Sequence, residues 1–251
     1  MGKFGVEGRM LETRRTKPKR MGNNTAFLIL NTNIVLSPLC MRYKFITIEG
    51  NIGAGKTTLT NILAERLNAR KILEGFEDNP FLPKFYEKPD QYAFPLELFF
   101  MAERFKQLKE MIAGAGLFQQ ITLSDYLFLK CLLFSKVNLQ EEEYKLYQRI
   151  FDIIHQQLIF PDILIYLHAP VDALQRNIRK RNRGYEQNIS DEYLLQIQEA
   201  YLTYIQQQNL KTIFVDASNA DFLNNENHVN AILQALEKEY TPGRHLLTLP
   251  K

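Results

Sequence analysis

The stretch that decides the fold is "YKFITIEGNIGAGKTTL" (Tyr43–Leu59). Its first half is a short, β-branched, apolar run, which is typical of a strand buried on both faces of a parallel sheet. Its second half contains "GNIGAGKT", from Gly50 to Thr57, which fits the spacing G-x-x-x-x-G-K-[ST] without a mismatch. Glycines let successive backbone N–H groups turn inward, and a helix that begins at Lys56 aims its positive end at the same point. The stretch therefore predicts a phosphate-binding loop between a buried strand and a helix.

The residue types in this loop indicate a bound triphosphate and Mg²⁺. Lys56 is expected to contact the β- and γ-phosphates, and the Thr57 hydroxyl to ligate the metal. An acidic partner for the metal is expected at the end of a neighbouring strand, where "ITLSD" offers Asp125, which could equally cap the helix that follows. The predicted nucleotide-binding residues are Gly50, Asn51, Ile52, Gly53, Ala54, Gly55, Lys56, Thr57 and Thr58.

Short apolar runs alternate with longer amphipathic stretches along the rest of the chain. This alternation predicts an α/β P-loop kinase fold, in which a five-stranded parallel sheet is flanked by helices and an Arg-rich lid covers the site. We expect strands at residues 44–49, 71–74, 120–124, 162–168 and 211–216, and helices at 56–69, 96–113, 127–134, 140–158, 171–180, 190–207 and 227–238.

Composition limits the classes of protein to which the chain can belong. The 251 residues are 45% hydrophobic, enough to fill a core, and no apolar run reaches the length of a membrane span. Cys40 and Cys131 show neither a pairing pattern nor metal-ligand spacing, so we expect reduced thiols and a cytoplasmic protein. The formal net charge is +3, but seven Lys or Arg against two Glu lie within residues 1–40. Neither a membrane nor a nucleic acid is therefore an expected partner of the folded part.

Residues 1–40 lack a clear amphipathic period, and Met41 stands directly before the first expected strand. Their basic character leaves a targeting peptide or a nucleic-acid or membrane arm open as alternatives. The favoured interpretation is a disordered extension or an upstream start, with Met41 as the true first residue. The kinase domain is then expected to span residues 41–251.

Three acids follow the second expected strand in "KILEGFEDNPF". Glu74 closes that strand, which places its carboxylate on the same edge of the sheet as the phosphate loop. A carboxylate at this edge could accept the proton of an attacking hydroxyl during phosphoryl transfer. Glu74 is therefore the preferred general base, and Glu77 and Asp78 are its competitors.

The segment "RNIRKRNRGYEQ" (176–187) carries five cations within eight residues, on and just after an expected helix. A solvated basic face is the ordinary interpretation of such a run. Beside a phosphate loop, however, a segment rich in arginine that contains a glycine is typical of a mobile lid whose arginines stabilise charge during transfer. Arg181 and Arg183 are the predicted catalytic arginines of this lid.

These features together resemble the deoxynucleoside kinases, the group of deoxycytidine, deoxyguanosine and deoxyadenosine kinases, in their bacterial branch. The resemblance rests on "IEGNIGAGKTTL", Glu74, "FYEKPDQYAFPLE" (85–97), the lid with "YEQ" and the late "FVDAS" (214–218), and it runs from about Tyr43 to Tyr240. It implies transfer of a phosphoryl group from ATP, with Mg²⁺, to the 5′-hydroxyl of a deoxynucleoside in nucleotide salvage. It also implies a homodimer.

The resemblance assigns roles to particular positions of this chain. Glu74 takes the part of the general base, and Tyr86 with Glu186 matches the pair that holds the deoxyribose 3′-hydroxyl. Asp216 and Ala217 resemble the start of the loop that packs on the adenine of the phosphate donor.

Base recognition is assigned in the same way. Glu97 falls where most relatives have a glutamine that reads the base edge, and Arg104 falls at a second base-contacting position on the same helix face. Phe81 and Phe105 are candidates for packing around the base, and core positions would suit them equally well.

The sequence also departs from the family pattern. Relatives usually carry an acid followed by arginine after the third strand, whereas "SDYLF" keeps Asp125 and has Tyr126 in the place of the arginine, so another group must supply that charge. An ionised Glu97, paired with Arg104, would only accept hydrogen bonds and would favour an exocyclic amine, which puts adenine or cytosine slightly ahead. Cys131 stands where some relatives have an acid that contacts the base.

Two other functions share parts of this pattern. A nucleoside monophosphate kinase of the thymidylate type has the same loop and lid, but it needs a further arginine for the acceptor phosphate, and Tyr126 occupies the expected position. A P-loop switch that controls a partner is the non-enzymatic alternative, but no guanine-specifying N/T-K-x-D run is present.

Overall fold

The sheet is built around β1 (Phe45–Gly50), whose residues are all buried. The computed structural model describes residues 41–75, 79–113, 121–156 and 158–250, which belong to one compact unit. Every strand pair of the sheet is parallel, and β1 lies between β3 and β4. Parallel sheets are usually covered by helices on both faces, which agrees with the complete burial of β1. The strand order is β2 (Arg70–Ile72), β3 (Thr122–Ser124), β1, β4 (Ile163–His168), β5 (Lys211–Asp216) and β6 (Gly243–Thr248).

The sheet has six strands, so the prediction of a five-stranded sheet was wrong. β6 pairs in parallel with the full length of β5, from Lys211 opposite Gly243 to Asp216 opposite Thr248. Its side chains alternate between half-buried and exposed, because it lies at the edge of the sheet. The short run "GRHLLT" therefore lacks the continuous apolar character by which the buried strands were predicted.

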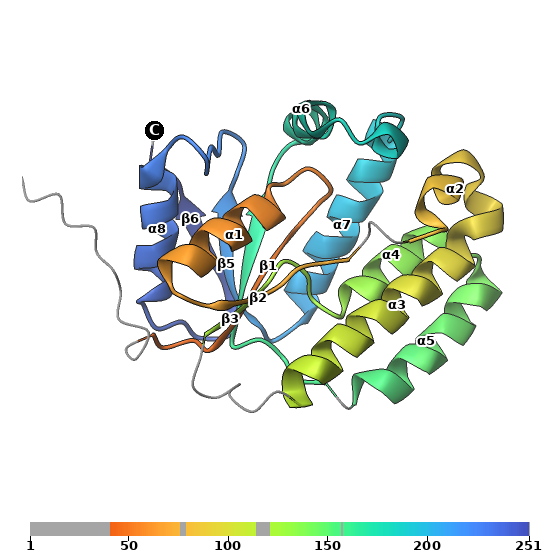
Figure 1. Cartoon of the computed structure of the whole chain (residues 1–251), viewed down its shortest axis with the longest axis horizontal. Coiled ribbons are helices and arrows are strands. Elements are labelled where there is room, and N and C mark those ends of the chain that lie inside the picture. The colour runs from red at the N-terminus through yellow and green to blue at the C-terminus, as the bar shows by residue number, and fades with distance from the viewer. Residues whose placement is uncertain (1–40, 76–78, 114–120, 157, 251) are drawn as a thin grey trace, which may run out of the picture. The chain divides into compact units, whose positions relative to one another are not determined.

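Helices cover both faces of the sheet (Figure 1). Leucines of α1 and apolar residues of α8 share one core with β1, whereas α4 and α7 pack with β4 and β5 in a separate core. The helices α2, α3 and α5 add a third core beside α4. The helical bounds are α1 (Lys56–Arg66), α2 (Leu82–Glu87), α3 (Pro89–Ala113), α4 (Lys130–Asn138), α5 (Glu141–His155), α6 (Val171–Arg181), the 3₁₀ turn η2 (Gly184–Glu186), α7 (Asp191–Gln207) and α8 (Glu226–Leu236).

The region before residue 96 is more helical than the sequence indicated. α2 was not predicted, and α3 begins at Pro89 and continues through Pro95. A proline inside a helix removes one backbone hydrogen bond, which is why its position suggested a helix start at residue 96. Burial of Ala93, Leu96 and Met101 on one side of α3 offsets that loss. In the longer helix, Glu97 lies in the helix interior and not in the first turn.

Two sets of sequence predictions lie outside the described residues. These are the interpretations of residues 1–40 and the competing acids Glu77 and Asp78. Within the described ranges, no helix combines the length and the apolar character needed to cross a membrane.

A buried acid fixes the carboxyl end of β1, where the phosphate loop begins. The Glu49 side chain is 1% exposed, and burial raises the pKa of its carboxyl group. Its Oε1 accepts a hydrogen bond from the Leu127 N–H at 2.7 Å, and its Oε2 accepts one from the Tyr201 hydroxyl at 2.8 Å. One side chain therefore connects the central strand to the segment before α4 and to α7.

Tyr201→Phe is expected to lower the free energy of unfolding by about 1–3 kcal/mol, because it leaves Oε2 of the buried Glu49 with only the longer hydrogen bond from the Gly50 N–H, at 3.1 Å. Tyr204→Phe on the same helix is the matched control, since the Tyr204 hydroxyl is buried without a hydrogen-bond partner in the described part of the chain. Urea denaturation measures both variants. Equal stability of the two variants would contradict the anchoring role of Glu49.

Candidate functional site

The phosphate loop has the backbone geometry that its glycines predict. Gly53 has a φ of +83°, and a Cβ atom there would lie 2.7 Å from the carbonyl oxygen of Leu174, so α6 leaves no room for a side chain. Gly55 has a φ of +91° and is the N-cap of α1. A left-handed residue at the N-cap turns the chain directly into the helix, so the N–H groups of the first turn of α1 face the loop.

Lys56, Thr57 and Asp125 meet at the mouth of this loop, as predicted. The Lys56 ammonium donates to the carbonyl oxygens of Gly50 and Asn51 at 2.9 and 3.0 Å. Burial, assisted by the charge of Lys130, lowers the pKa of Lys56 to about 8. The Thr57 hydroxyl donates to Asp125 Oδ2 at 2.5 Å. Thr57 and Asp125 therefore present adjacent hard oxygen atoms, which is the donor set that Mg²⁺ prefers.

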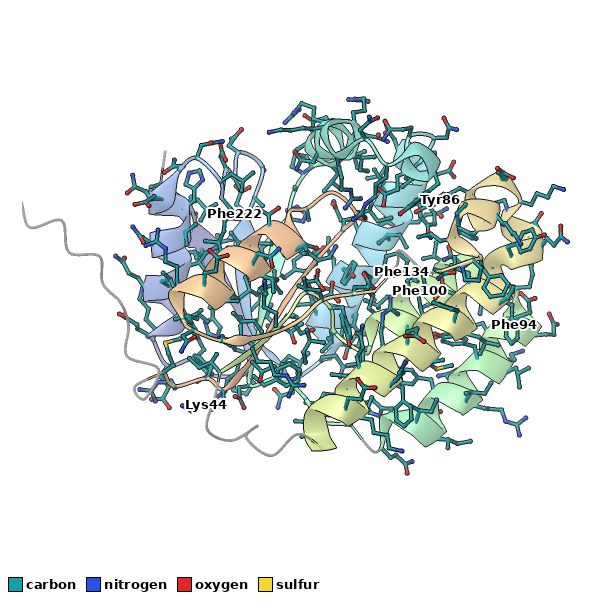
Figure 2. All side chains as sticks on the ribbon, viewed as in Figure 1. Lys44, Tyr86, Phe94, Phe100, Phe134 and Phe222 are labelled. Atoms are coloured by element: carbon teal, nitrogen blue, oxygen red, sulfur yellow. The ribbon has the colours of Figure 1, made fainter. Side chains whose placement is uncertain are left out.

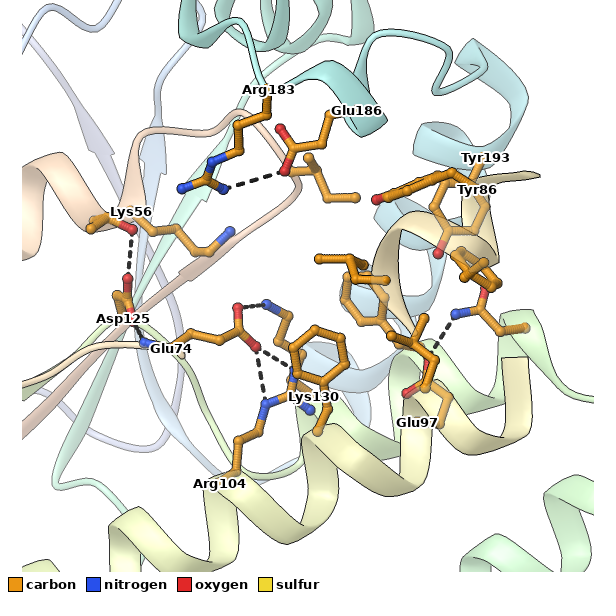
Figure 3. Close-up of a pocket in the computed structure, with 18 of the residues that line it drawn as sticks. Lys56, Glu74, Tyr86, Glu97, Arg104, Asp125, Lys130, Arg183, Glu186 and Tyr193 are labelled. Carbon is orange, nitrogen blue, oxygen red and sulfur yellow. Dashed lines mark hydrogen bonds and ion pairs between the residues drawn. The ribbon is translucent and has the colours of Figure 1, made fainter. Parts of the chain in front are cut away.

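One pocket of about 780 Å³, partly open to solvent, joins the phosphate loop to the helices α2, α3, α4, α7 and the lid segment (Figure 3). The predicted site residues that line it are Ile52, Lys56, Thr57, Glu74, Tyr86, Glu97, Arg104, Asp125, Arg181, Arg183 and Glu186.

Glu74 lies at the centre of a buried ion cluster. The strand β2 ends at Ile72, so Glu74 follows the strand rather than closing it, and its own N–H donates to Asp125 Oδ1 at 2.7 Å. Its Oε1 accepts hydrogen bonds from the Arg104 guanidinium, and its Oε2 accepts one from the Lys130 ammonium at 2.6 Å. Burial alone would raise the pKa of Glu74, but the charges and hydrogen bonds of the two cations hold it well below its usual range. Glu74 is therefore ionised.

Lys130 supplies the positive charge that is missing at Tyr126. The side chain of Tyr126 is fully buried, and its hydroxyl donates to Gln107 Oε1 at 2.8 Å, so it contributes no charge. Lys130 is also buried, at 6% exposure, and lines the pocket. It is the one charged residue in the apolar run "YLFLKCLLF" (126–134), a signal that could have identified it. A lysine is rarely buried unless it has a partner.

Arg104 does not pair with Glu97, which corrects a prediction made from the sequence. The guanidinium of Arg104 donates to Glu74 and, through Nη1, to the Cys131 sulfur at 2.9 Å. The Oε1 of Glu97 instead accepts a hydrogen bond from the Asn138 side-chain amide at 2.7 Å. Burial raises the pKa of Glu97 to about 7, against the smaller opposing effects of Asn138 and Arg104. Glu97 is therefore not held ionised.

The lid arginines lie beside the residues predicted to hold a sugar hydroxyl. Arg181 and Arg183 both donate to the carboxylate of Glu186, the latter at 3.3 Å. Glu186 itself is buried, and the ring of Tyr86 stacks on that of Tyr185 with centroids 6.1 Å apart. Tyr86 and Glu186 thus face the same pocket, as the sequence predicted.

Some predicted residues are placed elsewhere. Asn51 is buried and donates to the Leu194 carbonyl at 2.7 Å, which attaches the phosphate loop to α7. Asp216 is the last residue of β5, and Ala217 begins the loop whose Phe222 packs against Gly55. Phe81 and Phe105 belong to the core around α3 and are not among the residues that line the pocket.

Several pocket residues were not predicted. Phe100 of α3 and Phe134 of α4, both labelled in Figure 2, line the pocket, and each lies under a cation of the Glu74 cluster. The wall also includes Leu82, Phe85, Leu96, Asn138 and Tyr193. Each of these residues lies on a helix whose pocket side the sequence did not mark, because a pocket wall and a core face have the same apolar periodicity.

Comparison with known proteins identifies relatives of this chain in sequence and in structure. A family model described as "Deoxynucleoside kinase" matches residues 46–241. The chain is 34% identical over 193 residues to the deoxyguanosine kinase of Bacillus subtilis (strain 168), covering 75% of this chain and 93% of that protein. It is 32% identical over 197 residues to the deoxyadenosine/deoxycytidine kinase of the same organism, covering 76% and 90%. The solved structure of deoxyadenosine kinase from M. mycoides with bound dATP superposes with a TM-score of 0.68, at 25% identity and 77% and 100% coverage.

Proposed function

The chain belongs to the deoxynucleoside kinase family and phosphorylates deoxynucleosides, and from this premise we propose how its residues divide the work. In the proposed reaction the γ-phosphoryl group of ATP passes to the 5′-hydroxyl of a deoxynucleoside. The observation that carries the proposal is the position of the ionised Glu74 carboxylate, which lines the same pocket as Lys56 and Thr57, while the Glu74 backbone N–H donates to Asp125. A hydroxyl seated between them would face both a proton acceptor and a bound phosphate.

The donor end of the site is the loop from Gly50 to Thr58. Lys56 already lies over the loop carbonyls, and a phosphate there would restore the proton affinity that burial takes from its ammonium. Thr57 and Asp125 would hold Mg²⁺, which neutralises charge on the phosphates when it is bound. Asp216 and Ala217, next to the loop that packs on Gly55, are proposed neighbours of the donor base.

Glu74 is proposed to orient the 5′-hydroxyl and to take its proton. Its low pKa makes it a weak base, but transfer through a loose transition state depends more on position than on base strength. Each carboxylate oxygen has two lone pairs, so Glu74 can accept the substrate hydrogen bond while Arg104 and Lys130 stay in place. Lys130 acts in this scheme as a positioning residue for Glu74. It supplies the positive charge that relatives usually place at position 126, where this chain has a tyrosine.

The acceptor sugar and the lid complete the proposal. Tyr86 and Glu186 would hold the 3′-hydroxyl, because a phenol and a carboxylate can share its proton. Arg181 and Arg183 would move from Glu186 toward the transferring phosphate as the lid closes. The thymidylate-type alternative is not favoured, because the buried, uncharged Tyr126 takes the position where that class needs an arginine.

Glu74→Gln is expected to lower kcat by about 10²–10⁴-fold, since an amide can neither accept the proton nor keep two buried cations neutralised. The dissociation constant for ATP, measured by displacement of a fluorescent nucleotide, should stay near that of the wild type. Glu87→Gln on the exposed face of α2 is the surface control. Wild-type turnover by Glu74→Gln would refute the assignment of the base.

Lys130→Met is expected to lower kcat by about 10–100-fold, because Glu74 loses the hydrogen bond that fixes Oε2. The KM for ATP should change little, and Lys130→Arg should recover most of the activity. Lys136→Met, an exposed position on the same helix, is the matched control. A KM effect without a kcat effect, or no rescue by arginine, would show that Lys130 does not position the base.

A homodimer is also proposed, and its support is an apolar stripe on the outside of α5. Leu146 and Ile153 lie seven residues apart, on one face of the helix, and are 48% and 68% exposed. Light scattering should give twice the mass of one chain, and Ile153→Glu should halve that value. Leu246→Glu, at an exposed position of β6, should leave it unchanged. A monomeric wild-type protein would overturn the proposal of a homodimer.

The cytoplasmic location stays a prediction from the sequence.

A further inference from the structure

Glu97 has one oxygen that is satisfied and one that is not. Its side chain is buried at 2% exposure in the wall of the pocket, and its Oε1 accepts from the Asn138 amide. The Oε2 atom is buried without a hydrogen-bond partner in the described part of the chain. A buried polar atom without a partner costs free energy, so its presence in a pocket wall indicates a ligand group that pairs with it.

No cation of the described residues forms an ion pair with Glu97. The nearby cation of its own helix, Arg104, bonds to Glu74 and Cys131, and Lys130 of α4 also bonds to Glu74. The titratable or charged groups that act on Glu97 or feel its charge are Arg104 of α3, Lys130 and Cys131 of α4, Tyr147 of α5, Tyr193 of α7 and Glu74 after β2. Burial among these groups brings the pKa of Glu97 to about 7.

The two forms of this carboxyl group offer different hydrogen bonds. In the ionised form both oxygens only accept. In the neutral form the proton belongs on Oε2, because Oε1 already accepts from Asn138. The neutral group then presents an acceptor beside a donor, which is the pattern of a glutamine amide.

Nucleobases fall into two classes at the edge that such a group can read. Guanine presents two adjacent donors, its ring N1–H and its exocyclic amine, and an acceptor-only carboxylate pairs with both. Adenine and cytosine present an exocyclic amine beside an unprotonated ring nitrogen, which needs a donor opposite it. The preference for adenine or cytosine inferred from the sequence therefore suits the neutral form of Glu97, not the ionised one.

We propose that Glu97, held by Asn138, sets the base preference of this kinase through its ionisation: the carboxylate selects deoxyguanosine, and the neutral acid selects deoxyadenosine or deoxycytidine. The proposal rests on the proposed function, in which the pocket receives a nucleoside. It is consistent with relatives that are named for different bases, a deoxyguanosine kinase and a deoxyadenosine/deoxycytidine kinase.

A competition assay tests the proposal. Deoxyguanosine and deoxyadenosine are phosphorylated together, and the ratio of their kcat/KM values is followed from about pH 6 to about pH 8. Titrations of Lys56, Glu74 and the donor phosphates act on both reactions and cancel in the ratio. The ratio of deoxyguanosine to deoxyadenosine is expected to rise with pH by roughly tenfold or more, since each form of Glu97 pairs well with only one base.

Glu97→Gln removes the ionisation while keeping the size of the side chain. In this variant the ratio of kcat/KM for deoxyguanosine to that for deoxyadenosine should not change with pH and should favour deoxyadenosine. Glu110→Gln, at an exposed position on the same helix, is the control and should keep the pH dependence of the wild type. A flat wild-type ratio, or a slope that persists in Glu97→Gln, would overturn the role of Glu97. Absence of turnover with every deoxynucleoside would instead count against the proposed function.

Discussion

The buried charge cluster of Glu74, Arg104 and Lys130 is the interaction on which the site depends. A carboxylate withdrawn from water loses several kcal/mol of hydration, and only well-placed cations recover that loss. The two cations come from α3 and α4, while the acid follows β2, so the cluster sets the position of both helices relative to the sheet. The same bonds hold the Glu74 carboxylate ionised and fixed in the pocket. Stability and catalytic geometry are therefore determined by one set of contacts.

The cluster also determines what happens at the other end of the pocket. Arg104 and Glu97 lie seven residues apart on one helix face, which made an ion pair between them reasonable from the sequence alone. Because Glu74 engages Arg104, Glu97 is left with a neutral amide for a partner. Burial then raises the pKa of Glu97 instead of an ion pair lowering it. The hydrogen bonds that Glu97 can offer in the pocket thus depend on the bond between Arg104 and Glu74.

The sequence predicted those parts of the molecule whose physics is local. The phosphate loop, Thr57 and Asp125 were predicted because spacing and strand ends specify them. β6 was missed because its pairing with β5, and not its apolar content, makes it a strand. The start of α3 was predicted too late, because the sequence shows the cost of Pro95 but not the buried contacts of the helix around it. Lys130 was missed for a similar reason: its role comes from a contact with Glu74, 56 residues away in the chain.

The acids and cations at the carboxyl edge couple the two substrates in the proposed reaction. Arg104 and Lys130 are both engaged by the ionised Glu74, so a triphosphate would add negative charge that these two cations do not neutralise. Among the described residues that line the pocket, the other cations besides Lys56 are the lid residues Arg181 and Arg183, and both bond to Glu186. In the proposed reaction, their movement toward phosphate would free the Glu186 carboxylate for the sugar hydroxyl. Closure over the donor would therefore prepare the acceptor subsite, because one carboxylate would serve the arginines and the sugar in turn.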